Sequence, residues 1–374
     1  MIDILIAGDF CPYDRVANLI EEQNFYEIFG DVVDVIRNTD LSIVNLEAPV
    51  VETDLKPIIK SGPSLKTTNN AVKAIKYAGF DLATLANNHI FDYGAEGINQ
   101  TLAACKKENL DIVGIGSNLE NARKIYYKSV KGVCLAIINC CEHEFSIATD
   151  NTSGANPINP VSQYYSISEA RLRADKVIVI VHGGHEYYQL PSPRMQQIYR
   201  FFIDIGADAV INHHQHCFSG YEIYNERPII YGLGNLSFDD LKEKNKVWNE
   251  GYMVKLSMDD RQIIINTIPY IQGGNAPGVK LLKDRTLFDA RIVKLNNIIK
   301  DSNILNREFE KWMSLQQANY INVFEPYFGR ILSALKRRGL LPSFVKGRKV
   351  YKMLNTIQCE SHLDCLKHSF IRRL

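Results

Sequence analysis

The sequence predicts an α/β protein with a mostly parallel sheet, and two observations support this fold class. Short apolar runs alternate with segments in which apolar residues recur at helical spacing, as is typical of parallel sheets. Each run also ends in Asp, Glu, Asn or His, and the carboxyl ends of parallel strands meet at one edge, where ligands bind. The five runs comprise residues 2–7, 41–44, 80–85, 176–181 and 209–212.

The segments between and after these runs predict the remaining elements of the core. Apolar residues at helical spacing predict helices over residues 25–37, 71–77 and 195–205. Residues 220–231 and 251–270 are rich in Ile, Val and Tyr and predict strands. The family resemblance described below assigns these strands to a second sheet.

The last of the five runs ends in three histidines within four residues, His213-His214-Gln215-His216. In an extended chain His214 and His216 share a face, so both rings can reach one site, whereas His213 points the opposite way. Histidine is the commonest transition-metal ligand, and this spacing predicts a metal site. A His-rich surface loop is the alternative interpretation.

The other runs end in polar residues that suit the same site. Asp9, Glu47, Asn88 and His182 each follow a predicted strand, so they are expected to converge on one crevice with the histidines. Carboxylate, amide and imidazole donors together favour a divalent ion of intermediate hardness, such as Mn, Fe or Zn.

Taken together and in this order, the strand-end motifs resemble those of the capsule-synthesis CapA family of poly-gamma-glutamate synthesis type. That family is a branch of the calcineurin-like metallophosphoesterase superfamily, and the resemblance covers roughly residues 1–240. It implies a four-layer α/β/β/α metallophosphatase-like sandwich with one or two divalent ions. The motifs are Gly8-Asp9, Asn45-Leu46-Glu47, Ala86-Asn87-Asn88-His89 with Asp92-Tyr93-Gly94, His182-Gly183-Gly184-His185-Glu186-Tyr187, His213-His214-Gln215-His216 and Tyr231-Gly232-Leu233-Gly234-Asn235.

The resemblance also implies roles for individual residues. Glu47 stands where the superfamily has its bridging carboxylate, and His89 matches the catalytic histidine. His89 either transfers a proton during catalysis or only positions Asn88 or another ligand. The implied metal ligands are Asp9, Glu47, Asn88, His182, His214 and His216.

One departure from the superfamily pattern concerns the first motif. The superfamily opens with Asp-x-His, whereas this chain reads Asp9-Phe10-Cys11, which leaves one metal subsite a nitrogen short. Two interpretations of Cys11 are open: a thiolate ligand, which would suit zinc, or a small buried residue that packs as a hydrophobe. Occupancy by a single ion is therefore open as well.

Further residues of the same motifs are assigned to substrate binding or to the positioning of ligands. Gly232-Leu233-Gly234 is expected to make a tight backbone approach near the site, because paired glycines allow unusual φ and ψ. It lacks the setting of a dinucleotide-binding loop. The assigned residues are Asn45, Asn87, His185, Glu186, His213 and Asn235.

Composition excludes several classes of protein. A net charge of +1 argues against a generic nucleic-acid-binding protein. Eight irregularly spaced cysteines form no disulfide framework, and reduced thiols are the simplest assumption. No apolar run is long enough for a membrane span. Met1 leads directly into the first strand without a signal peptide, so a cytoplasmic location is expected.

The chain changes character near residue 280. We expect a metallophosphatase-like domain over residues 1–280 and a basic helical C-terminal extension over 281–374. From Pro326 onward there are eleven Lys or Arg and two Asp or Glu. The extension either makes a peripheral contact with a membrane or anionic polymer, or folds back as a lid or dimer contact, and the oligomeric state stays open. Its expected helices span residues 302–319, 325–338 and 345–357.

The function expected from these features is that of a metal-dependent, phosphoesterase-like hydrolase. The resemblance links it to capsule, polysaccharide or poly-gamma-glutamate metabolism, with an anionic or envelope-polymer-related substrate. The alternative is a non-hydrolytic accessory protein of polymer biosynthesis whose metal site binds polymer or serves structure.

Overall fold

The computed structural model describes residues 1–243, 246–327 and 329–371. The chain forms two compact units, Met1–Asn306 and Arg307–Leu374. This division lies beyond the boundary expected near residue 280, because helix α9 (Thr286–Lys300) packs on strand β11 (Tyr221–Tyr224) of the first unit.

The first sheet of the first unit is mixed. Its order is β16-β15-β14-β1-β2-β3-β4, with β13 also beside β1. Strands β1 to β4 are parallel, whereas β14 runs antiparallel to β1 and begins an antiparallel edge. The strands are β1 (Ile2–Phe10), β2 (Leu41–Leu46), β3 (Leu82–Thr84), β4 (Asp111–Val113), β13 (Asn235–Ser237), β14 (Glu250–Met258), β15 (Ile263–Gln272) and β16 (Val279–Leu281).

The second sheet has the order β11-β12-β10-β9-β7-β6, and a small antiparallel pair, β5 with β8, lies apart from both. Strands β7, β9, β10 and β12 are parallel neighbours, so their carboxyl ends share one edge. The strands are β5 (Ile115–Gly116), β6 (Tyr126–Val130), β7 (Val133–Cys141), β8 (Gly154–Ala155), β9 (Lys176–His182), β10 (Ala209–His213) and β12 (Arg227–Ile230).

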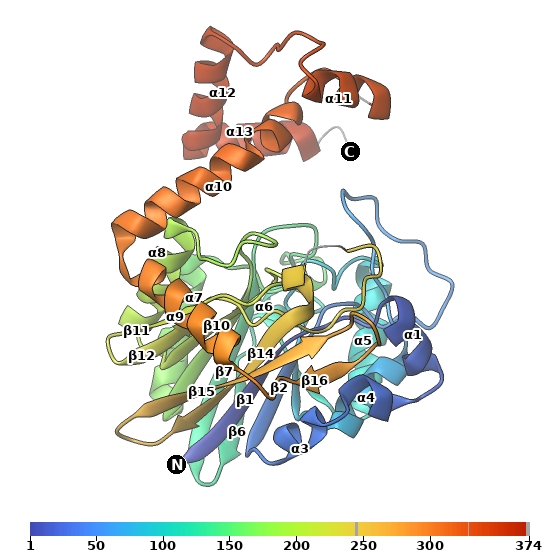
Figure 1. Cartoon of the computed structure of the whole chain (residues 1–374), viewed down its shortest axis with the longest axis vertical. Coiled ribbons are helices and arrows are strands. Elements are labelled where there is room, and N and C mark those ends of the chain that lie inside the picture. The colour runs from blue at the N-terminus through green and yellow to red at the C-terminus, as the bar shows by residue number, and fades with distance from the viewer. Residues whose placement is uncertain (244–245, 328, 372–374) are drawn as a thin grey trace. The chain divides into compact units, whose positions relative to one another are not determined.

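The two sheets pack face to face, and helices cover their outer faces (Figure 1). Ile4 and Ile43 of the first sheet join Ile178 and Ile211 of the second in one buried cluster. Strands buried on both faces require continuous apolar runs, as the sequence has. Helices α1 to α5 cover the first sheet, and α7 and α8 cover the second, which confirms the four-layer α/β/β/α sandwich. The helices are α1 (Asp14–Glu21), α2 (Phe25–Phe29), α3 (Val32–Arg37), α4 (Asn69–Ala78), α5 (Gly94–Lys107), α6 (Leu119–Ala122), α7 (Pro160–Arg173), α8 (Pro193–Asp204) and the 3₁₀ turn η1 (Lys246–Asn249).

Two element predictions need correction. The helix expected over 25–37 is divided into α2 and α3, because Gly30 has φ +47° between them. Of the strands expected in the second sheet, β11 and β12 do belong there, but β14 and β15 join the first sheet. Their composition predicts a strand without indicating its partner, and β14 pairs along the free side of β1 from Ile2 to Ile6.

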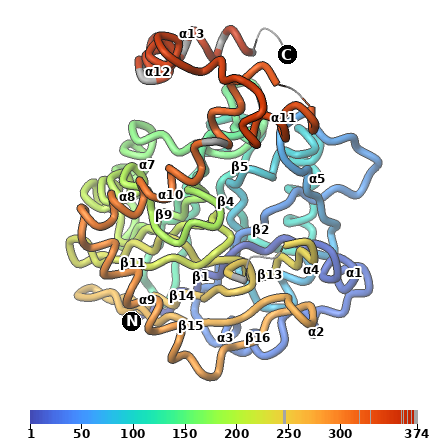
Figure 2. The backbone as a smooth tube through the Cα atoms, turned by 45° about the horizontal axis from the view of Figure 1, so that its top comes forward, coloured from blue at the N-terminus to red at the C-terminus, as the bar shows by residue number. Residues whose placement is uncertain are grey.

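The backbones of β1 and β13 approach each other closely although they lie far apart in the sequence (Figure 2). A Cβ atom at Gly8 would collide with the carbonyl oxygen of Gly234, and Gly234 itself has φ +78°. The expected tight approach at Gly232-Leu233-Gly234 is therefore confirmed. Only a residue without a side chain fits immediately before Asp9.

The second unit is helical. It contains most of α10 (Ser302–Asn322), together with α11 (Arg330–Arg337), α12 (Arg348–Gln358) and α13 (Glu360–Ile371). Three helices were expected after residue 280. Helix α13 in this unit and α9 in the first unit are additional. Across the described residues, every helix is too short or too polar to cross a bilayer.

Candidate metal centre

The predicted ligands come together where strands of both sheets end. Asp9 lies on β1 and Glu47 follows β2, while His182 and His214 belong to the ends of β9 and β10. The expectation from strand periodicity placed all of them on one sheet edge. The structure instead divides them between two sheets whose carboxyl ends meet across the sandwich.

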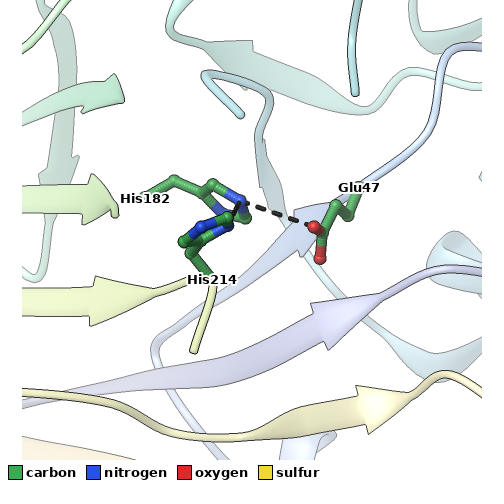
Figure 3. Close-up of side chains that lie close together, drawn as sticks. All are labelled: Glu47, His182 and His214. Carbon is green, nitrogen blue, oxygen red and sulfur yellow. Dashed lines mark hydrogen bonds and ion pairs between the residues drawn. The ribbon is translucent and has the colours of Figure 1, made fainter. Parts of the chain in front are cut away.

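One group of potential ligands consists of Glu47, His182 and His214 (Figure 3). Nε2 of His182 lies 3.4 Å from Oε1 of Glu47 and 3.1 Å from Nδ1 of His214. The same nitrogen lies 3.0 Å from Oδ1 of Asn88. Nε2 of His182 therefore lies within 3.4 Å of three other donor atoms, and the four residues that carry these atoms are all buried.

A second group shares Glu47 with the first and adds Asp9 and His216. Nε2 of His216 lies 3.8 Å from Oε1 of Glu47. Glu47 thus stands between two groups, which is the position that the resemblance assigned to a bridging carboxylate. All six predicted ligands belong to these two groups or contact them.

The donor set fits a divalent cation. Glu47 is fully buried, and neither of its carboxylate oxygens has a hydrogen-bond partner among the described residues. Burial and the nearby carboxylate of Asp9 raise the pKa of Glu47 well above its ordinary value. Burial lowers the pKa of His182 well below its usual range and that of His214 to about 3, so both rings are neutral. Neutral imidazole beside an unpartnered carboxylate suits Mn, Fe or Zn.

Two asparagines hold ligands in position. Asn45 donates from Nδ2 to Oδ1 of Asp9 at 2.7 Å, and the other oxygen of Asp9 accepts from the backbone N–H of His214 at 3.1 Å. Oδ1 of Asn235 lies 2.8 Å from Nδ1 of His216, which directs Nε2 of that ring toward Glu47. Such contacts set the orientation and tautomer of metal-binding histidines.

His89 forms a buried cluster with two charged residues beside the ligand groups. Nδ1 of His89 lies 2.8 Å from Oδ2 of Asp92, and Asp92 also forms an ion pair with Lys60. Asn87 accepts the backbone N–H of His89 at 3.1 Å. Burial lowers the pKa of His89, while Asp92 opposes this shift. With Nδ1–H donated to Asp92, Nε2 is the nitrogen left for a substrate.

A pocket of about 440 Å³ opens above this cluster, and His89 and His216 are part of its lining. Trp248 and Phe238 enclose the ring of His216 at centroid distances of 4.6 and 5.4 Å, and Tyr187 stacks on Trp248 at 5.8 Å. Glu186 also lines the pocket. The two ligand groups therefore lie beside a pocket that has an aromatic wall. Its opening is large enough for a small substrate or a polymer end.

Three residues other than glycine at or beside the ligand groups have a positive φ. His214, His216 and Tyr187 have φ of +87°, +53° and +62°. Residues other than glycine rarely adopt this conformation, and such residues cluster at functional sites. Tyr187 and His216 line the pocket and His214 belongs to the first ligand group, so the strained backbone supports a functional site there.

Several residues that border the site carried no role in the sequence predictions. Asp92 lies in a quoted motif, three residues after His89, and that spacing is a signal for the dyad. Lys60 lies in the irregular segment between residues 51 and 66, and Trp248 lies in η1, so neither had a strand-end signal. Glu144 also lines the pocket. It comes three residues after β7 ends, so it carries no strand-end signal in the sequence.

Two other predicted residues lie outside the ligand groups. Nε2 of His213 lies 3.0 Å from the carbonyl oxygen of Ala7, so His213 faces away from His214 as expected and ties β10 to β1. His185 is half-buried, and burial lowers its pKa.

Cys11 packs in a buried apolar cluster with Leu65 and Trp248. Burial raises its pKa well above the ordinary value, which keeps it a thiol. This favours the interpretation of Cys11 as a packing residue.

The chain is a four-layer α/β/β/α sandwich of the metallophosphatase-like class, with two overlapping carboxylate–histidine groups where strands of both sheets end. The model of the family described as "Bacterial capsule synthesis protein PGA_cap" matches residues 3–240, and the chain belongs to this family.

Curated relatives agree with this membership. The chain is 31% identical over 303 residues to the "Capsule biosynthesis protein CapA" of Bacillus anthracis, a match that covers 78% of this chain and 73% of the relative. It is 36% identical over 243 residues to the "PGA biosynthesis protein CapA" of Bacillus subtilis (strain 168), covering 63% of this chain and 64% of the relative. The second match therefore spans less than two thirds of that relative.

Solved structures are more distant. A putative 5′-nucleotidase from Staphylococcus aureus is 18% identical with a TM-score of 0.44, and the match covers 83% of this chain and 58% of that one. A hypothetical protein from Thermus thermophilus is 13% identical with a TM-score of 0.47, covering 72% of this chain and 99% of that one.

Proposed function

We propose that this protein is a metal-dependent, phosphoesterase-like hydrolase that acts in capsule, polysaccharide or poly-gamma-glutamate metabolism. The observation that carries the proposal is the buried carboxylate of Glu47, which lacks hydrogen-bond partners among the described residues and stands between two ligand groups. A buried ionised carboxylate without a partner destabilises a protein, and either a proton or a bound cation removes this cost. Its place between two groups of potential ligands favours the cation.

The proposed chemistry combines the ion with His89. When bound, a divalent ion polarises the scissile group and provides a nucleophile at neutral pH. Asp92 accepts from Nδ1 of His89, so Nε2 is free to receive or return a proton at the leaving oxygen. Asp92 holds the ring of His89, and Asn87 holds its backbone N–H, so both the ring and its point of attachment are fixed.

The charges around the pocket indicate that an anionic substrate would bind there through a metal ion. Glu144 and Glu186 line the pocket together with Lys60, and burial and Glu186 raise the pKa of Glu144. Without a cation these carboxylates would repel an anionic substrate. One or two divalent ions held at Glu47 would offset much of this negative charge.

The place of the reaction is also part of the proposal. The names of the Bacillus relatives refer to capsule and PGA biosynthesis. The eight cysteines form no disulfide within the described ranges of the chain, which supports a cytoplasmic location, because the cytosol keeps thiols reduced. Cell fractionation tests the location directly.

A substrate screen with the reconstituted full chain tests the activity. The metal-stripped protein is loaded separately with Mn, Fe and Zn and assayed on an aryl phosphate, on a phosphodiester and on γ-glutamyl amides. We expect turnover with at least one ion and its loss in Glu47→Gln. Stoichiometric metal binding without turnover on any of these substrates would contradict the hydrolase.

One observation favours the alternative of a non-hydrolytic accessory protein. The group around His216 has only Asp9, Glu47 and His216 as donors among the described residues, since Cys11 is packed as a thiol. A poorly held second ion would leave a binding site with little catalytic power. In that case poly-glutamate should bind in a metal-dependent way and remain intact.

A further inference from the structure

The second unit contains a segment whose charges all have one sign. Between Pro326 and Cys359 the sequence has no Asp or Glu. We call residues 329–358, which include α11 and α12, the basic helical segment. Its cations are Arg330, Lys336, Arg337, Arg338, Lys346, Arg348, Lys349 and Lys352. Glu325, just upstream, forms an ion pair with Lys336 at 3.4 Å, and the segment itself offers no acidic residue to the other cations.

Helix α11 separates its apolar and basic residues on opposite sides. Ile331 and Leu335 are four residues apart and share one side with Leu332, whereas Arg330 and Arg337, seven apart, share the other. Ile331 is 76% exposed, and no residue of this helix is buried. The helix therefore presents an apolar side to solvent.

Helix α12 repeats this arrangement. Val350, Leu354 and Ile357 recur at helical spacing and are exposed, and Arg348 and Lys352 lie opposite them. The connection between the two helices adds exposed Leu340 and Phe344. Two consecutive helices and their link thus combine exposed large apolar side chains with an excess of positive charge.

We propose that the basic helical segment docks the protein on the surface of an anionic lipid bilayer. Amphipathic helices with Lys and Arg on the polar side and large apolar residues on the other bind in the plane of such an interface. The apolar sides of α11 and α12 enter the boundary between headgroups and acyl chains. The cations then contact lipid phosphates and gain from the negative surface potential.

The positive charge and the exposed apolar side chains together fit an anionic bilayer better than a soluble polyanion or a second copy of the chain. A soluble polyanion would neutralise the cations but leave Ile331 and Leu354 in water. A second copy of the chain would cover the apolar sides but bring two strongly positive segments together. Packing of these helices on the first unit is the alternative predicted from the sequence. The experiment below distinguishes it from membrane docking.

The test measures sedimentation of the full chain with lipid vesicles. Vesicles of phosphatidylcholine alone are compared with vesicles that also contain phosphatidylglycerol, at low and high salt. We expect binding to the anionic vesicles only, and weakening as salt screens the charges. A Tyr351→Trp variant provides a second signal, because Tyr351 is 76% exposed. The fluorescence emission of the introduced tryptophan should shift to shorter wavelength when the segment enters the bilayer.

Matched variants separate the two contributions. Arg337→Gln with Lys349→Gln should lower the affinity about fivefold for each charge removed. Lys128→Gln with Lys131→Gln removes the same charge from the first unit and should have little effect. In the Tyr351→Trp variant, Ile331→Asn with Leu354→Asn should abolish the shift of tryptophan emission to shorter wavelength. The corresponding control is Leu172→Asn with Leu287→Asn, which are exposed elsewhere.

Three outcomes would overturn the proposal. The first is the absence of binding to anionic vesicles at low salt, and the second is an equal loss of binding in the control variants. The third comes from limited proteolysis of the full chain without lipid, and it is protection of the basic helical segment. Protection at every protein concentration would indicate that the segment packs on the first unit. Protection only at concentrations where the chain is dimeric would indicate that it packs on a second copy. The test is independent of the proposed hydrolase, since it requires no turnover.

Discussion

Oδ1 of Asn235 lies 2.8 Å from Nδ1 of His216, so this asparagine determines which nitrogen of the ring faces Glu47. Asn235 comes from β13, which is held against β1 at Asp9. The contact therefore joins two members of one ligand group through neighbouring strands.

The first prediction concerns this contact. Asn235→Ala should weaken the ion bound by Asp9, Glu47 and His216 about 10–100-fold, the usual effect of removing a partner that orients a ligand. Asn235→Asp keeps the acceptor and should retain most of the affinity. Calorimetric titration of the metal-stripped protein with Mn measures both, and exposed Asn99→Ala is the control. Equal affinities in all three variants would contradict the positioning role.

Glu47→Gln should abolish binding at both groups and yet stabilise the metal-free protein. Because burial raises the pKa of Glu47, the protein loses stability as the pH rises from the ordinary carboxyl pKa to that raised value, and above it the loss is constant. The cost is absent below the ordinary carboxyl pKa, so the variant should gain most at high pH. The expected gain is about 1–3 kcal/mol in the free energy of unfolding.

Urea unfolding of both metal-stripped proteins over a pH series measures this difference. A gain that is independent of pH would mean that the Glu47 carboxylate is neutralised in some other way.

His89→Ala should retain the metal and lose turnover. The ring contacts Asp92 and lines the pocket but is absent from both ligand groups, so kcat should fall on the order of 10²–10⁴-fold. Elemental analysis of the variant is compared with that of His214→Ala, which should lose metal. If His89→Ala loses metal to the same extent, His89 is a ligand.

Lys60→Met should destabilise the protein more than a similar change at the surface. The Lys60 and Asp92 side chains are 4% and 0% exposed, so the substitution leaves Asp92 without its cation inside the protein. Breaking such a buried pair costs about 3–5 kcal/mol. Lys128→Met, in the exposed pair with Asp111, is the matched control and should cost less than about 1 kcal/mol.

The double variant Lys60→Met with Asp92→Asn should recover part of the loss. Thermal unfolding followed by circular dichroism measures all four proteins. Equal losses at Lys60 and Lys128 would show that the buried pair contributes little.

The sequence was informative where position along a strand determines position in space. Asp9, Glu47 and His182 could be predicted as neighbours because the end of a buried strand is visible as the end of an apolar run. Lys60 and Trp248 reach the same pocket from irregular chain and a 3₁₀ turn, whose course depends on tertiary packing.

The same limit explains the misplaced strands. Alternating Ile, Val and Tyr in β14 and β15 shows that these residues suit a sheet, but the vacant side of β1 is a property of the assembled fold. The resemblance compensated for this limit, because it implied two sheets where periodicity alone suggested one.

One carboxylate that belongs to two ligand groups would make two bound ions thermodynamically dependent on each other. A first ion would withdraw negative charge from Glu47 and would also fix its orientation for a second. These effects have opposite signs, and their sum is a single coupling free energy. Reciprocity requires that each ion change the affinity of the other by the same factor, so metals mixed in a titration will not report independent constants.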